Sequence, residues 1–479
     1  MRKWFSSLLV LLFCLIPNAF AAGLPDLGDV GVDDLSPAKE RQMGEEIMRE
    51  VRQDPSVIDD PVVAEYISRL GRRLVAASAE PGRAFEFFVV KDAMLNAFAF
   101  PGGYIGVHTG LILAAQSESE LAGVLGHEIG HVTQRHIAQL IGKQKQLTWM
   151  TLASILAGLA AKNPQVSEAV IVSGVAGATQ AQLGYSRDFE READRIGLQT
   201  LESAGFDARG MAAFFERLQR NSRLYENSAP AYMRTHPLTT ERIADMENRV
   251  MSMRYRQVPD SPDFGYVRAR LRVQSMPAVE AVRLFAGQIE GSPNNAALRY
   301  GLAYAQLKQG RLEEAAHTAD AMRRWAAFSP LVAGLSAEIA MARHDTDSAI
   351  KTLTAAYRDF PDRMSLVYAL ADAQIAGGQA AEAEKTVRRA LSGHGNDARL
   401  WGLLAHANAN LGHRSAQYRA QSEVYVLQGA WRAALEQLEL ARRAGDGDFY
   451  EMSAIDARLR EIRKRSVEEK WRDPPRKLR

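Results

Sequence analysis

Cysteine is almost absent from this sequence of 479 residues, because its one cysteine, Cys14, lies near the start. Residues 1–21 are typical of a secretory signal peptide: Arg2 and Lys3 precede an apolar run from Trp4 to Ile16, and Ala19-Phe20-Ala21 fits a cleavage site. An apolar run of about 13 residues is short against the roughly 20 that span a bilayer, which favours export with cleavage over a membrane anchor. The mature chain then has no thiol and can form no disulfide, so its fold must depend on its hydrophobic core.

An excess of charge is also lacking. Without the signal peptide, 57 lysines and arginines balance 57 aspartates and glutamates. This balance argues against nucleic acid as a general partner. The stretch 451–479 is locally basic, and we interpret it as a solvated C-terminal helix or tail.

The first part of the chain mixes helical and strand patterns. Residues 38–78 carry apolar side chains at spacings of three and four, which predicts helices. Residues 85–90 and 104–108 are rich in β-formers and are separated by turn residues, so a small sheet is expected. A helix is predicted over 117–142, and a second one is predicted to begin near Asp188.

The second part of the chain contains a repeat. Ala315, Ala349 and Ala383 follow one another at 34 residues, which is the period of tetratricopeptide repeats. Pro361 falls where that motif ends its second helix, although an unrelated helical bundle stays an alternative. Stacked helix pairs of this kind form a concave surface that binds other chains.

The stretch LAGVLGHEIGHVTQRH, residues 121–136, contains polar residues within an otherwise apolar helix pattern. His127 and His131 are one helical turn apart, so both imidazoles can reach one metal ion. Glu128 completes the HExxH pattern, in which the glutamate holds a water and takes its proton. HExxH alone is short, and a surface helix with satisfied histidines is the alternative. The apolar neighbours favour the metal site, because burying these side chains without partners is costly.

A catalytic zinc needs a third protein ligand. His136 is not expected to be one, because the extended pattern HExxHxxGxxH places its histidine one residue later and a glycine where Gln134 stands. Within SRDFEREADRIG, Glu190 and Asp194 are four residues apart and share a helix face. Glu190 is the candidate ligand, and Asp194 is the candidate acceptor of a hydrogen bond from a ligating histidine. A charged, solvated helix face is the alternative.

Four segments together resemble a known family: HEIGH, SRDFEREADRIGL, NAFAFPGGYIGVHTGLI and RTHPLTTERI. They are similar to the BepA-type family of secreted zinc metalloproteases, in which a gluzincin domain precedes C-terminal tetratricopeptide repeats. The resemblance implies one Zn²⁺ per chain, held by His127, His131 and Glu190, with Glu128 as the general base and Asp194 beside the site. It also implies that His236 occupies the fourth metal position in a latent state.

The resemblance further implies a fold and a cellular role. The fold would be mainly α: a protease domain of α+β type with a small sheet, followed by an α-solenoid. We divide the chain into a signal peptide (1–21), a zinc metalloprotease domain (22–265), a linker or first helix pair (266–293), tetratricopeptide repeats (294–450) and the basic end (451–479). The implied function is a periplasmic endopeptidase of a Gram-negative bacterium that degrades misfolded or stalled outer-membrane β-barrel proteins and assists their assembly. Its repeats would bind the β-barrel assembly machinery.

The sequence leaves several functional alternatives open. A non-proteolytic chaperone or scaffold is the second interpretation, although an intact Glu128 favours an enzyme. A substrate is expected to pair with the strand at 104–108, treated as an edge strand, where Gly102, Gly103 and Gly106 would admit a peptide or simply form a tight hairpin. The apolar tract 147–180 would cover the cleft, make peripheral contact with a membrane surface, or form a core helix.

Overall fold

The computed structural model describes residues 35–143, 187–223, 231–322 and 329–470. The expected signal peptide and the tract 147–180 lie outside these residues. The described part is mainly helical and contains one sheet of three strands, which confirms the predicted fold class. None of its helices combines the length and the apolar character needed to cross a membrane.

The sheet has the order β1-β3-β2. β1 (Glu86–Val90) pairs with β3 (Tyr104–His108) in parallel, and β2 (Ala97–Phe100) pairs with β3 in antiparallel fashion. β3 is therefore the central strand, and the expectation that it is an edge strand is wrong. The two edge strands are β1 and β2, and β2 is a run of only four residues that the sequence pattern did not reveal.

The glycines near β3 have structural roles. Gly102 and Gly103 have positive φ angles of 83° and 92°, which fit the turn between β2 and β3. A Cβ at Gly106 would come within 2.4 Å of the Phe98 ring. These contacts support the hairpin alternative over close approach of a peptide.

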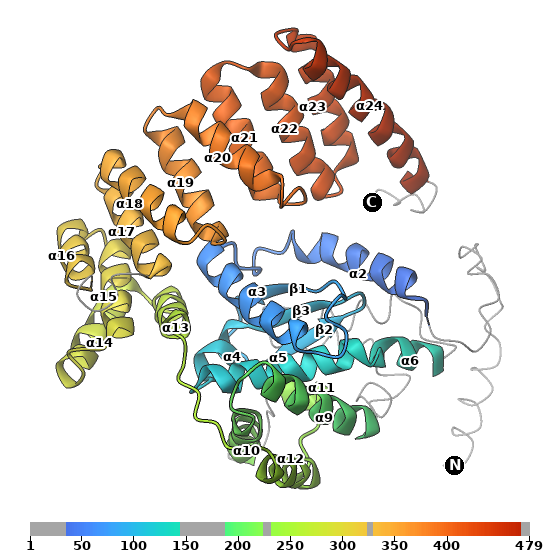
Figure 1. The fold of residues 1–479 in the computed structure, drawn as a ribbon, viewed down its shortest axis with the longest axis vertical. Helices are drawn as coiled ribbons and strands as arrows, with labels where there is room; N and C mark the ends of the chain where they lie inside the picture. Colours follow the sequence, from blue (N-terminus) through green and yellow to red (C-terminus); the bar gives the residue numbers. More distant parts are fainter. Residues whose placement is uncertain (1–34, 144–186, 224–230, 323–328, 471–479) are drawn as a thin grey trace, which may run out of the picture.

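Helices cover both faces of the sheet (Figure 1). Met48 of α2 (Pro37–Val51) packs with an aromatic cluster on one face, formed by Phe88, Phe98, Phe100 and Tyr104. The other face carries Val89, Ala97 and Ala99, which belong to the main core with residues of α3 (Pro61–Ala76) and α5 (Glu118–Thr133). Ser36 and Asp60 cap α2 and α3, and each helix has proline at its start.

The helix predicted over 117–142 is two helices, α5 and α6 (His136–Lys143). Arg135 separates them because its φ of 55° lies in the left-handed region. α9 (Arg187–Ser203) begins where the second helix was predicted, and α10 (Arg209–Arg223) follows it. α5 and α9 approach closely at their glycines: a Cβ at Gly126 would lie 3.1 Å from the carbonyl oxygen of Gly197. This approach brings the side chains of α9 to the HExxH helix.

The remaining helices continue the chain away from the sheet. α4 (Thr109–Ala114) follows β3, and α11 (Ala231–Thr235) and α12 (Thr240–Ser252) follow α10. The C-terminal helices then form an arc (Figure 1). In chain order they are α13 (Pro262–Gln274), α14 (Ala278–Gly291), α15 (Ala296–Lys308), α16 (Leu312–Met322), α17 (Pro330–Ala342), α18 (Thr346–Asp359), α19 (Met364–Ala376), α20 (Ala380–Leu391), α21 (Ala398–Leu411), α22 (Arg414–Leu427), α23 (Trp431–Ala444) and α24 (Phe449–Lys470).

The 34-residue spacing matches equivalent buried positions in the arc. Ala315, Ala349 and Ala383 lie on α16, α18 and α20, and each is fully buried. Residues 266–293, for which the sequence left a linker or a helix pair open, lie mostly in α13 and α14. The domain boundaries themselves stay predictions.

Contacts with α3 and the segment before it attach the arc to the N-terminal part. The carboxylate of Glu65 on α3 accepts hydrogen bonds from the backbone N–H of Met364 (2.9 Å) and from the hydroxyl of Ser365, so it caps the start of α19. Arg270 on α13 donates to Asp60 at 2.6 Å. Further along the arc, a Cβ at Gly429, in the turn between α22 and α23, would lie 2.8 Å from Cδ of Arg49 on α2. The arc therefore contacts the N-terminal part through α13, through the start of α19 and through the turn between α22 and α23.

Candidate metal centre

His127 and His131 project from one face of α5 into the interior. Their Nε2 atoms lie 3.0 Å apart, and their rings are almost perpendicular. Both side chains are buried, as is Glu128 between them. The i, i+4 spacing therefore produces the convergence that the sequence predicted for the two imidazoles.

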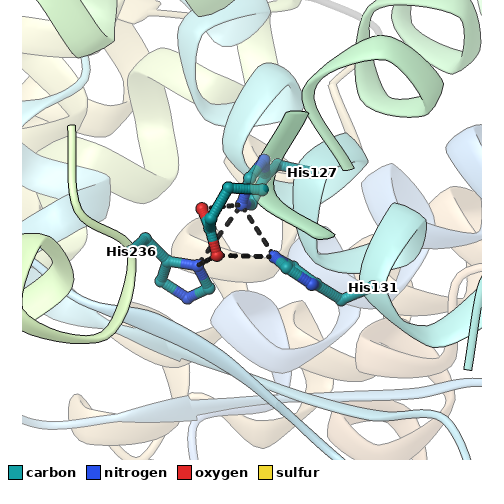
Figure 2. Close-up of side chains that lie close together, drawn as sticks. His127, His131 and His236 are labelled. Carbon is teal, nitrogen blue, oxygen red and sulfur yellow. Dashed lines mark hydrogen bonds and ion pairs between the residues drawn. The ribbon is translucent and has the colours of Figure 1, made fainter. Parts of the chain in front are cut away.

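Two other elements each supply a further side chain. Glu190 of α9 places Oε2 3.5 Å from Nε2 of His127 and Oε1 3.5 Å from Nε2 of His131. His236, which follows α11, places Nδ1 3.3 Å from Nε2 of His127 and 3.1 Å from Oε1 of Glu190. Figure 2 shows the three histidines His127, His131 and His236 pointing toward one another. One donor atom from each of these histidines and from Glu190 lies within 4.8 Å of every other.

This arrangement fits a tetrahedral metal ion. Ligand distances of roughly 2.0 to 2.1 Å separate the ligand atoms of a tetrahedral ion by about 3.3 to 3.4 Å, close to the separations observed here. Among the described residues, neither carboxylate oxygen of the buried Glu128 has a hydrogen-bond partner. Such a buried acceptor calls for a polar partner, which a water beside the ion would supply. The donor set of imidazoles and a carboxylate is one that divalent transition metals prefer.

His127 has a carboxylate on the side of its ring that faces away from this group. Its Nδ1 lies 3.0 Å from Oδ1 of Asp194, one turn after Glu190 on α9. Arg242 of α12 donates to both oxygens of Asp194 at 2.8 Å, and its Nη1 also lies 2.8 Å from Oε2 of Glu190. Asp194 thus lies beside a histidine of the HExxH pattern, as the sequence predicted, and its role as a hydrogen-bond acceptor stays a prediction. Arg242 was missed as a functional residue, although it lies in the RTHPLTTERI segment.

His136 lies behind His131. The two Nδ1 atoms are 2.8 Å apart, and His136 is absent from the group of four side chains that can hold an ion. The interpretation that His136 is not a ligand thus agrees with its position. Its contact with His131 was not anticipated.

Burial and charge set the electrostatics of the centre. Burial raises the pKa of Glu128, while the nearby His236 and His127 oppose this shift. Burial also acts to raise the pKa of Glu190, but His236 and His127 outweigh it and hold that pKa well below its usual range. Glu190 is therefore a carboxylate suited to a cation, whereas Glu128 more readily holds a proton.

The fold and this buried HExxH centre are those of a metallopeptidase. The sequence profile of Peptidase family M48 matches residues 61–250, and a tetratricopeptide profile matches residues 278–339 and 340–407. More particularly, the chain belongs to the family of β-barrel assembly-enhancing proteases. It is 34% identical over 447 residues to the protein of that name from Escherichia coli K12, and the match covers 92% of this chain and 91% of the relative.

Two further relatives place the chain more broadly. The putative β-barrel assembly-enhancing protease of Vibrio cholerae is 32% identical over 445 residues, covering 92% of both chains. The mitochondrial metalloendopeptidase OMA1 of Arabidopsis thaliana is 32% identical over 211 residues, or 44% of this chain and 40% of that one. The likeness to OMA1 is thus partial, whereas the bacterial relatives match almost throughout. The non-proteolytic interpretation is not favoured by these relatives.

Proposed function

We propose that this protein is a zinc-dependent endopeptidase that acts on outer-membrane β-barrel proteins, degrading misfolded or stalled chains and assisting their assembly. The observation that carries the proposal is the convergence of His127, His131 and Glu190 around one point. Glu128 lies beside them, with its Oε1 3.5 Å from Nε2 of His236. Three nitrogen and oxygen ligands with one further position match a catalytic zinc site. One Zn²⁺ per chain is the expected content.

In this proposal His127, His131 and Glu190 hold the metal, which when bound acts as a Lewis acid toward water and the scissile carbonyl. Glu128 takes a proton from the attacking water and passes it to the leaving amine. Its burial excludes bulk solvent and disfavours the charged carboxylate, so proton uptake is favourable. Asp194 fixes the orientation and tautomer of His127.

The proposed place for an extended substrate is the edge of β2 that does not pair with β3. This proposal replaces the expectation that the substrate pairs with β3. The carbonyl of Asn96 accepts from the N–H of His108, so it faces β3. Backbone groups alternate along a strand, hence those of Leu95, Ala97 and Ala99 face the other way. No backbone hydrogen bond from outside the sheet reaches Ala97 or Ala99 in the described part of the chain. An added strand would pair there.

His236 is the proposed latch. Its Nδ1 lies at the fourth corner of the ligand set, where a fourth imidazole would exclude the water that hydrolysis needs. The same segment reaches the substrate edge, because the N–H of Tyr232 donates to the carbonyl of Leu95 at 3.1 Å. Tyr232 also stacks on His236, with ring centroids 4.6 Å apart. Release of this segment would therefore open the metal position and the edge together.

The proposed location is the periplasm of a Gram-negative bacterium, after cleavage of residues 1–21. The names of the bacterial relatives point to β-barrel assembly, and the tetratricopeptide profile points to binding of other chains. We propose the β-barrel assembly machinery as the partner of the repeats. Nucleic acid is not a proposed partner, and peripheral membrane contact stays a prediction for the tract 147–180.

Metal analysis and cleavage assays on the wild type and Glu128→Gln test this function. The wild type should contain about one zinc per chain and cleave an unfolded outer-membrane β-barrel protein. Glu128→Gln should keep the metal and the fold but lose cleavage by roughly 10²-fold or more, since it cannot act as a base. Equal cleavage by the two proteins would refute the catalytic role of Glu128. A metal-loaded wild type that binds unfolded β-barrel proteins without cutting them would support the scaffold alternative.

A further inference from the structure

The two metal-facing histidines of α5 have different partners behind them. Nδ1 of His127 faces the carboxylate of Asp194, whereas Nδ1 of His131 faces a second imidazole, Nδ1 of His136, at 2.8 Å. His136 is fully buried. A fully buried histidine in contact with a ligand, and itself outside the ligand set, requires an explanation of its own.

The hydrogen-bond geometry assigns the protons on both rings. If His131 binds the metal through Nε2, its Nδ1 carries the proton and donates it. Nδ1 of His136 must then be the acceptor, so the proton of His136 lies on Nε2. That nitrogen lies 3.3 Å from Oε2 of Glu192, and a carboxylate can only accept. One arrangement of protons therefore satisfies both contacts.

Three helices hold His136 in this orientation. Its ring stacks on Phe189 of α9 with the centroids 4.4 Å apart and the planes 14° from parallel. Glu192 lies on the same helix. Phe189 and Glu192 therefore stand on either side of the proposed ligand Glu190 in the sequence of α9. The left-handed backbone of Arg135 ends α5 and turns the chain so that α6 begins at His136. Stacking on Phe189 thus holds one face of the His136 ring, and the contact with Glu192 holds its Nε2 edge.

We propose that His136 is a positioning residue of the metal centre: as a neutral imidazole, it accepts the Nδ1–H of His131 and so holds Nε2 of that ligand toward the metal. Glu192 in turn fixes the tautomer of His136. The inference deepens the proposed function, because it rests on His131 being a ligand. It gives the second histidine of HExxH an uncharged partner, in contrast to the carboxylate behind the first.

Two substitutions of His136 test the inference through metal affinity. Asn places an acceptor oxygen where Nδ1 of histidine lies, while Phe keeps the stack on Phe189 but has no acceptor. We expect His136→Phe to bind zinc about 10- to 100-fold more weakly in competition with a chelating dye, the loss typical of removing an outer partner. His136→Asn should recover most of that affinity. Equal affinity in wild type and His136→Phe, or equal loss in both variants, would overturn the proposal.

Two controls keep the outcome clear. Thermal melting of the metal-free proteins should place His136→Phe within a few degrees of the wild type, so that weaker binding is not unfolding. Should that variant unfold, ¹⁵N NMR of histidine-labelled wild type still decides, since the proposal requires the proton of His136 on Nε2 and a proton on Nδ1 would refute it. His131→Ala tests the underlying function separately: full zinc retention there would refute the ligand assignment itself.

Discussion

Arg242 donates two hydrogen bonds of 2.8 Å to Asp194, which lies 48 residues earlier in the chain. Both side chains are buried. The same guanidinium reaches Glu190, so one cation neutralises a proposed ligand and the carboxylate behind another. Its removal would leave two buried carboxylates without their shared counter-charge, which is a costly state.

Arg242→Gln should therefore weaken both metal binding and the fold. We expect zinc affinity to fall roughly 10- to 100-fold, and the free energy of unfolding to fall by about 3 to 5 kcal/mol. Arg191→Gln on α9 is the matched control, because the ion pair of Arg191 with Glu241 is exposed and contributes little. Chelator competition and denaturant titration measure the two effects. Similar behaviour of the two variants would contradict the role given to Arg242.

The grouping of the HExxH residues, and of Glu190 with Asp194, was predictable, whereas the contacts of Arg242 and His136 were not. Helical geometry alone places His127 and His131 on one face, and the same argument pairs Glu190 with Asp194. Arg242 and His136 reach the centre only through tertiary packing: one depends on how α12 lies against α9, the other on the left-handed backbone of Arg135. No spacing rule within a sequence contains that information.

The fold, too, was predictable from the sequence only in part. Long periodic helices and the 34-residue repeat could be read from the sequence, because they extend over many residues. The strand β2 could not, since four residues give too short a pattern to separate from a turn. That one missed strand also reversed the status of β3 from edge to centre. Strand order is a long-range property, so an error in the number of strands changes every inference about edges.

A substitution in β2 tests the substrate edge. Ala97→Pro removes the one N–H of that residue, which faces the free edge and makes no bond to β3, and proline is tolerated at the start of an edge strand. We expect kcat/KM for an extended peptide to fall between about twofold and tenfold, as for loss of one hydrogen bond, with zinc content unchanged. Unchanged kcat/KM in a variant that melts like the wild type would place the substrate elsewhere.

The contact between Asp60 and Arg270 makes the junction of the two parts sensitive to acid. Burial acts to raise the pKa of Asp60, but Arg270 outweighs it, and the pKa lies below the ordinary value of 3.8. A lowered carboxyl pKa gives stability that is present above pH 3.8 and is lost as the pH falls through the folded-state pKa. Asp60→Asn keeps the helix cap while removing the charge.

Melting curves of the wild type and Asp60→Asn from pH 7 down to pH 3 should therefore converge. At pH 7 the wild type should melt at the higher temperature. The difference should shrink as the pH falls below 3.8, because the unfolded chain binds the Asp60 proton there while the folded protein binds it only at lower pH. Glu45→Gln is the control, because the ion pair of Glu45 with Arg41 is exposed. A difference that persists unchanged to the lowest pH would show that the charge of Asp60 does not stabilise the junction.

Because His236 occupies the fourth position of the proposed ligand set, its removal should raise activity. Every other variant of the centre proposed above should lower activity or metal affinity. Three protein ligands leave one position on a tetrahedral zinc for water, and a fourth imidazole takes it. His236→Ala should therefore raise basal proteolysis while zinc content stays near one per chain. A bias of 1.4 kcal/mol toward the closed form would mean about a tenfold rise on removal. The double variant Glu128→Gln/His236→Ala should be inactive, which assigns the added cleavage to this centre. An inactive His236→Ala protein that still binds zinc would refute the latch and would indicate instead that His236 stabilises charge in the transition state.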